Sequence, residues 1–171
     1  TVTTLFFSDN AADAEIKGIE GDITWVPQAV PGLTLSGAFS ILDTEIKELV
    51  GASVAIAGPG EKLSYAPSFQ GNLRARYEWD IMDDVLAHIQ PSIAYSASSF
   101  SDIVLINRAV QDSYFLMGLA VGFTKENWAL EVFGENLTDE RVQLNNNLVF
   151  DRERIATNRP RTFGIRFSVD Y

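Results

Sequence analysis

Two pairs of acidic residues are the first candidates for chemistry in this chain. Glu20 and Asp22 are two positions apart, and Glu131 and Glu135 are four positions apart. Carboxylates that lie side by side can act as a general acid and a general base. Each pair lies on one side of an extended segment, on a polar face that also contains arginines. We therefore expect ion pairs across a sheet, which contribute roughly 0.2–1 kcal/mol each, instead of catalysis.

The single histidine, His88, is the other candidate for acid–base work. It lies on the polar side of its segment, where a hydrogen-bonding role explains it better than a role as a general base. The sequence has no cysteine, no Ser–His–Asp arrangement, no glycine-rich phosphate loop and no spacing typical of metal ligands. We therefore expect a protein that is not an enzyme and that needs no cofactor or metal.

Amides and guanidinium groups are concentrated between residues 141 and 161. Guanidinium groups bind carboxylate or phosphate oxygens in pairs of hydrogen bonds, so this segment is a candidate ligand-binding surface. The alternative is that these side chains are solvated loop residues. The candidates are Asn145, Asn146, Asn147, Arg152, Arg154, Arg159 and Arg161.

The elements that must position these residues are extended strands. In seven segments, apolar and polar residues alternate with a period of two, which is typical of strands with one apolar face. Phe133 breaks the alternation in one of them. We predict an all-β chain with strands at 17–26, 33–41, 69–79, 85–96, 115–123, 128–136 and 162–171.

The connections between these strands alternate in length. Short ones (27–32, 80–84 and 125–127) follow every second strand, and long ones (47–67, 97–113 and 137–161) follow the others. All tight turns then lie at one end of the sheet, as in outer-membrane barrels. We predict an antiparallel up-and-down transmembrane β-barrel segment. Residues 1–7 would be part of an eighth strand, and residues 8–14 its loop.

Aromatic residues gather beside the short connections. Amphipathic rings prefer the boundary between membrane and water, where barrels carry aromatic girdles. A second, opposite ring of aromatic residues can be drawn through Phe69, Tyr95, Phe115 and Phe163, at the ends of strands away from the short connections. The separation between the two rings is about 20–25 Å, which matches the apolar band of an outer-membrane barrel. The predicted girdle at the short turns is Trp25, Tyr77, Trp79, Phe123, Trp128 and Tyr171.

The polar faces of the strands are rich in charge and small residues, which suits a water-filled lumen. The predicted lumen-facing residues are Glu20, Asp22, Arg74, Arg76, Glu78, His88, Gln90, Glu131, Glu135 and Arg166. A soluble β-barrel that binds a small apolar ligand in its interior would show the same alternation. The net charge of −10 argues against nucleic acid as a partner, because phosphates attract basic residues.

Several stretches resemble one family of membrane proteins. WALEVFGENLTDERV (128–142) and NRPRTFGIRFSVDY (158–171) resemble the closing portion of TonB-dependent outer-membrane receptors. AEIKGIEGDITWVP (14–27) and YAPSFQGNLRARYEW (65–79) are similar to strands that precede it in that family. The resemblance implies a bacterial outer-membrane location and a larger barrel of about 22 strands, of which residues 1–171 form the C-terminal part. A plug domain is not found in the sequence.

The resemblance also implies a function and partners. Such a receptor takes up a scarce nutrient, most often a ferric siderophore and otherwise cobalamin, haem or a glycan. Its partners would be outer-membrane lipid and lipopolysaccharide, the rest of the barrel, the plug, TonB through the plug, and the assembly machinery that recognises the last strand with its terminal Tyr171. A small passive outer-membrane barrel, with residues 1–7 as a complete eighth strand, is an alternative to this interpretation.

Overall fold

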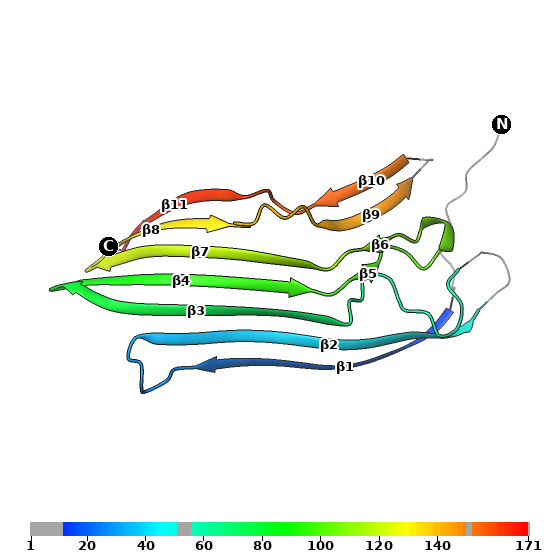
Figure 1. Ribbon diagram of the computed structural model, residues 1–171, viewed down its shortest axis with the longest axis horizontal. Coiled ribbons are helices and arrows are strands. Elements are labelled where there is room, and N and C mark those ends of the chain that lie inside the picture. Colours follow the sequence, from blue (N-terminus) through cyan, green and yellow to red (C-terminus); the bar gives the residue numbers. More distant parts are fainter. Residues whose placement is uncertain (1–11, 51–55, 150–151, 171) are drawn as a thin grey trace.

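The main feature of the computed structural model is one sheet of seven antiparallel strands, in the order β1-β2-β3-β4-β7-β8-β11 (Figure 1). The model describes residues 12–50, 56–149 and 152–170. Neighbouring strands of the sheet follow one another along the chain, so the predicted all-β, up-and-down fold is confirmed. The strands are Ala12–Trp25 (β1), Leu33–Leu49 (β2), Phe69–Met82 (β3), Val85–Ser96 (β4), Tyr114–Lys125 (β7), Trp128–Glu135 (β8) and Thr162–Val169 (β11).

The register of the sheet aligns apolar with apolar and polar with polar residues. Leu73 of β3 is opposite Ile93 of β4, and Phe123 of β7 is opposite Leu130 of β8. Successive side chains of a strand point to opposite faces, so the sheet has one apolar face and one polar face. This agrees with the alternation in the sequence.

The short turns lie at one end of the sheet and the long loops at the other (Figure 1). Two turns have only two residues, and both contain a residue with positive φ, Asp84 at 63° and Glu126 at 48°. The turn between β1 and β2 ends at Gly32, where φ is 86° and a Cβ atom would lie 2.1 Å from the carbonyl oxygen of Glu78. Only glycine fits this position without strain.

Four strands, β1, β2, β3 and β7, are longer than the sequence predicts, β8 and β11 are slightly shorter, and the long connections contain more regular structure than expected. β1 begins at Ala12, inside the expected loop 8–14, and β2 continues to Leu49. The second long connection contains β5, a single 3₁₀ turn and β6, and the third contains the hairpin of β9 and β10. The predicted strand at residues 1–7 lies outside the described residues. The additional elements are β5 (Ser99–Phe100), Leu105–Asn107, β6 (Val110–Gln111), β9 (Gln143–Val149) and β10 (Arg152–Thr157).

The apolar face of the sheet is exposed, unlike that of a soluble sandwich, and the buried residues of the sheet include polar ones. On the apolar face, Ile165 is 73% exposed and Leu73 is 47% exposed. On the polar face, His88 is only 6% exposed, and Ser96 is also buried. Among the residues that the structure describes, no helix is both long and apolar enough to cross a membrane.

The first two long loops (residues 50–68 and 97–113) are fastened to each other. The amide of Tyr65 donates a hydrogen bond to the carbonyl oxygen of Phe100 at 2.7 Å. Arg108 donates from Nη2 to Oε2 of Glu61 at 3.1 Å, and its guanidinium group lies 3.8 Å from the centroid of the Phe100 ring. Since these contacts join segments from different hairpins, the two loops form one structural unit.

The third long loop (residues 136–161) joins the same unit through its hairpin. The hydroxyl of Tyr65 donates to Oδ1 of Asn145 at 2.9 Å and also lies 3.2 Å from the carbonyl oxygen of Asn146. Gln111 of β6 donates from Nε2 to the carbonyl oxygen of Gln143 at 3.2 Å. Tyr65 therefore contacts both other loops.

Candidate functional site

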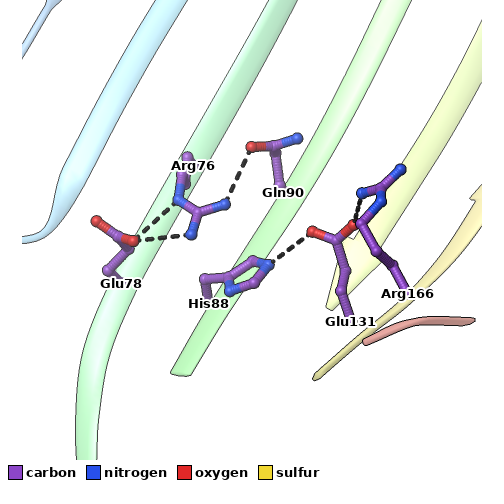
Figure 2. A network of polar contacts seen from close by, with 6 residues as sticks. All are labelled: Arg76, Glu78, His88, Gln90, Glu131 and Arg166. Atoms are coloured by element: carbon purple, nitrogen blue, oxygen red, sulfur yellow. Dashed lines mark hydrogen bonds and ion pairs between the residues drawn. The ribbon is translucent and has the colours of Figure 1, made fainter. Parts of the chain in front are cut away.

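A row of polar residues crosses five strands on the polar face of the sheet. The register places Glu78 of β3 opposite His88 of β4, His88 opposite Gly122 of β7, and Gly122 opposite Glu131 of β8. Glu131 is in turn opposite Arg166 of β11. Figure 2 shows the side chains of Glu78, His88, Glu131 and Arg166, and His88, Glu131 and Arg166 are joined in it by dashed lines. Because these five residues are far apart in the sequence, the row cannot be recognised from the sequence alone.

The missing side chain at Gly122 lets His88 reach Glu131. Nε2 of His88 lies 3.1 Å from Oε2 of Glu131, although β7 separates their strands (Figure 2). A Cβ atom on Gly122 would lie 2.7 Å from Cε1 of His88. Glu131 uses its other oxygen to accept a hydrogen bond from Nη1 of Arg166. The carboxylate therefore bridges a buried imidazole and an exposed guanidinium group.

A second row of residues lies next to the first. Arg76 donates from Nε to Oε1 of Glu78 at 2.9 Å and from Nη1 to Oε1 of Gln90 at 3.3 Å (Figure 2). At the other end of the row, a Cβ atom on Gly164 would lie 2.4 Å from the ring of Phe133. Phe133 thus covers a glycine on the polar face, which explains why it breaks the alternation in the sequence.

The remaining lumen candidates have other surroundings. Glu20 accepts a hydrogen bond from the hydroxyl of Ser40 at 3.4 Å, and both Glu20 and Asp22 line a shallow hollow of about 400 Å³. Arg74 and Glu135 line a second hollow of about 360 Å³. Arg166 is the arginine that pairs with an expected partner on another strand, whereas Arg76 pairs within its own strand.

The hollow at Arg74 is the best candidate for binding a polar ligand. Arg74, Arg159 and Glu135 are the charged residues of its lining, and Asn72 and Ser92 are among its uncharged polar residues. Apolar groups make up the larger part of the lining, among them those of Leu116 and Met117. It adjoins another hollow of about 320 Å³ that extends along the polar face and includes Arg74 and Arg166. Together they form a polar groove that leads from the third long loop toward the row at His88.

The vestibule candidates of the third loop do not form one site. Arg159 is the one candidate arginine that lines the hollow at Arg74. Arg152 and Arg154 are exposed on β10, and Arg161 donates from Nη1 to the carbonyl oxygen of Leu137 at 3.4 Å. The others are amides of β9: Asn145 accepts from Tyr65, Asn146 is buried and donates to Glu153 at 2.7 Å, and the side chain of Asn147 lies outside the described part.

The base of the third loop is closed by a set of hydrogen bonds that we did not anticipate. Asn136 is buried, has a positive φ of 50°, and donates from Nδ2 to the carbonyl oxygens of Glu140 and Arg159, both at 3.0 Å. Asp139 accepts at Oδ1 from the amide of Arg161 at 2.9 Å. These contacts join the segments NLTDE (136–140) and NRPR (158–161), so the two stretches that carried the family resemblance form one clamp.

Asp139 gives this clamp a predicted pH dependence. The hydrogen bond from the amide of Arg161 lowers the pKa of the Asp139 carboxyl below its ordinary value of 3.8, and Arg141 and Arg161 act in the same direction. The clamp is therefore fully stabilised above that value, and this stabilisation is lost as the pH falls through the lowered pKa. Hydrogen-exchange protection of the Arg161 amide, corrected for the intrinsic rate, should fall in acid. Asp139→Asn, which cannot be deprotonated, should show no such transition over this range.

The candidate girdle residues lie on the apolar face beside the short turns. The rings of Tyr77 and Trp79 stack with centroids 5.6 Å apart. Trp128 makes an edge contact with Phe123 at 5.5 Å, and its ring lies 6.5 Å from that of Phe167. Trp25 is exposed. Tyr171 lies outside the described residues.

The described residues hold no group of three or more histidine, cysteine, aspartate or glutamate side chains that could bind a metal ion. The guanidinium, amide, hydroxyl and carboxylate groups that line the hollows can bind organic ligands through hydrogen bonds and ion pairs.

Several solved structures are similar to this chain, among them three receptors. The ferric yersiniabactin uptake receptor FyuA from Yersinia pestis aligns with a TM-score of 0.76 and 16% identity, over 95% of this chain and 24% of that receptor. The siderophore receptor PiuA from Acinetobacter baumannii gives 0.70 and 14%, over 91% and 22%. The ferric-catecholate import receptor Fiu from E. coli K12 gives 0.66 and 22%, over 90% and 20%. The chain thus spans about a quarter or less of each receptor.

The sequence comparison identifies the family. No curated protein matches the chain. A model of the domain described as "TonB dependent receptor-like, beta-barrel" matches residues 1–137 of the 171. This match confirms the resemblance, and with it an outer-membrane location in place of the soluble barrel that we considered. The chain belongs to the β-barrel family of TonB-dependent receptors.

Proposed function

We propose that this chain is the C-terminal wall of a receptor that imports a scarce nutrient, with ferric siderophores as the ligand class. The observation that carries the proposal is the groove of charged and amide side chains along the polar face, next to the long loops. The likeness to three siderophore receptors supports it. The ligand would meet the long loops first, and the hollow lined by Arg74 and Arg159 would form part of the vestibule.

The two faces of the sheet then have different surroundings. The polar rows at His88 and Gln90 face a wet lumen that also contains the plug, through which the receptor contacts TonB. The apolar face contacts lipid, with the aromatic residues near the short turns forming the periplasmic girdle. The long loops lie at the cell surface near lipopolysaccharide, and β11 is the strand that the assembly machinery recognises. The strand edges of β1 and β11 pair with the rest of the barrel, because an open edge is not tolerated in hydrocarbon.

Uptake of iron by the full receptor tests the proposal. Deletion of the gene should slow uptake of radiolabelled iron supplied as a catecholate or a hydroxamate complex, and the intact gene should restore it. The double substitution Arg74→Ala with Arg159→Ala should reduce uptake about tenfold, because both guanidinium groups contribute charge-assisted hydrogen bonds. Arg152→Ala is the matched control, since this arginine is exposed on β10 outside the hollow. Equal uptake by the deletion strain and its parent would contradict the proposal.

A further inference from the structure

A small, partly open chamber lies where the ends of three strands meet all three long loops. Its volume is about 150 Å³, room for a single sugar-sized ring. Tyr65 comes from the first loop, Ser99 and Gln111 from the second, and Gln143 from the third. The chamber is separate from the groove at Arg74, with which it shares no lining residue. The polar residues that line it are Tyr65, Gln70, Ser96, Ser99, Gln111, Asp112, Tyr114 and Gln143.

The strand ends form the floor of the chamber. Gln70 of β3 is opposite Ser96 of β4, and Ser96 is opposite Tyr114 of β7, so the three form one row on the polar face. Ser96 is buried and donates a hydrogen bond to the carbonyl oxygen of Ala97 at 3.2 Å. Because β-sheet pairing holds the three backbones, this floor is rigid.

Contacts between the loops hold the walls of the chamber. Gln111 is buried, accepts from the hydroxyl of Ser99 at 3.1 Å and donates to the carbonyl oxygen of Gln143 at 3.2 Å. Tyr65 reaches across to Asn145 through its hydroxyl. The protein's own hydrogen bonds therefore hold the walls in place, which lowers the entropic cost of binding.

The chemistry of the lining favours an uncharged ligand. It consists of hydroxyl and amide groups with one carboxylate, Asp112, and it contains no lysine or arginine. A ligand carboxylate or phosphate would lose its hydration without gaining a cationic partner, which is costly. A hydroxyl group can instead donate to Asp112 and accept from the amides. The tyrosines offer ring surface beside their hydroxyl groups.

We propose that this chamber binds one uncharged, hydroxyl-rich ring, the chemistry of a sugar unit, as part of the ligand that the receptor imports. The inference rests on the proposed function and assigns to this corner of the vestibule a ligand class different from that of the charged hollow at Arg74. The charged hollow takes anionic groups of the imported ligand, and the chamber takes its neutral ring.

Binding of two matched probes to the full receptor in detergent tests this assignment. Methyl glucoside is uncharged, and methyl glucuronide has the same ring with a carboxylate added. Saturation-transfer NMR and calorimetric titration should detect methyl glucoside and should show at least about tenfold weaker binding of the glucuronide. Equal or tighter binding of the glucuronide, or no binding of methyl glucoside, would overturn the proposal.

Two variants place the binding in the chamber. Tyr114→Phe removes one hydroxyl group from the floor and keeps the ring, and Gln111→Leu removes the buried amide. Each should weaken the binding of methyl glucoside about tenfold, while Arg154→Ala on the exposed hairpin should leave it unchanged. Unchanged binding in both chamber variants would refute the site. Iron uptake measured in parallel distinguishes the sugar-binding proposal from the proposed function. Normal iron uptake without binding of methyl glucoside would refute sugar binding in the chamber and leave the proposed function intact.

Discussion

Leu73→Arg is expected to lower the free energy of unfolding of the assembled barrel in a bilayer by about 2–4 kcal/mol. Leu73 lies on the apolar face near the middle of β3, opposite Ile93, and is 47% exposed. In water this exposure would make arginine harmless. In an outer-membrane barrel, the same side chain contacts hydrocarbon, where a guanidinium group has no partner. Urea titration of the full receptor in lipid vesicles measures the change.

Asn72→Arg is the matched control for this substitution. Asn72 precedes Leu73 on the same strand, points to the opposite face and lines the polar hollow. An arginine there stays in the wet lumen, so the free energy of unfolding should change by less than about 0.5 kcal/mol. Equal destabilisation by the two substitutions would contradict the assignment of the faces, and a larger effect at Asn72 would reverse it.

Gly122→Val is expected to be the most damaging change on the polar face. A Cβ atom at this position would lie 2.5 Å from the carbonyl oxygen of Leu130 and 2.7 Å from the imidazole of His88. Overpacking of this kind costs about 1–3 kcal/mol. The added methyl groups would also push His88 away from Glu131, which leaves a buried imidazole without its partner. The same urea titration reports the loss of stability.

Two further glycine substitutions calibrate that result. Gly58→Ala is the control, because a Cβ atom there would have no atom within 4 Å, and we expect no measurable change. Gly122→Ala should fall between Gly58→Ala and Gly122→Val, since it introduces the clash but not the additional bulk. If Gly122→Val is as stable as the parent receptor, the row across the strands is not packed as described.

The seven strands could be predicted from the sequence because their signal is local. Alternation along β3, for example, depends only on which residues contact lipid and which contact water. The same local signal placed the tight turns at one end of the sheet. The strand ends were less predictable: β2 extends to Leu49 because its last residues pair with the start of β1, where Ala12 is opposite Leu49. The first long loop also folds back on β2, with Leu63 donating from its amide to Oγ1 of Thr44 at 3.2 Å.

The site was less accessible to sequence reasoning, since it depends on register. The contact between His88 and Glu131 requires that Gly122 lie between them. No sequence feature near His88 predicts that Gly122 will be its neighbour. The clamp at the third loop had a visible signal in NLTDE, but its partner, Arg161, is more than twenty positions away. The arginines of the third loop are close in sequence, which predicts one binding surface. In the structure Arg152 and Arg154 lie on β10, away from Arg159 in the hollow at Arg74.

The meander of the sheet has a consequence for how such receptors change over evolutionary time. Each strand pairs with its neighbours in the chain, so a hairpin brings its own pairing partners with it and makes few demands on distant segments. Duplication or deletion of one hairpin would alter the circumference of the cylinder while every other register stayed the same. The hairpin is therefore the unit whose gain or loss disturbs the fewest strand pairings.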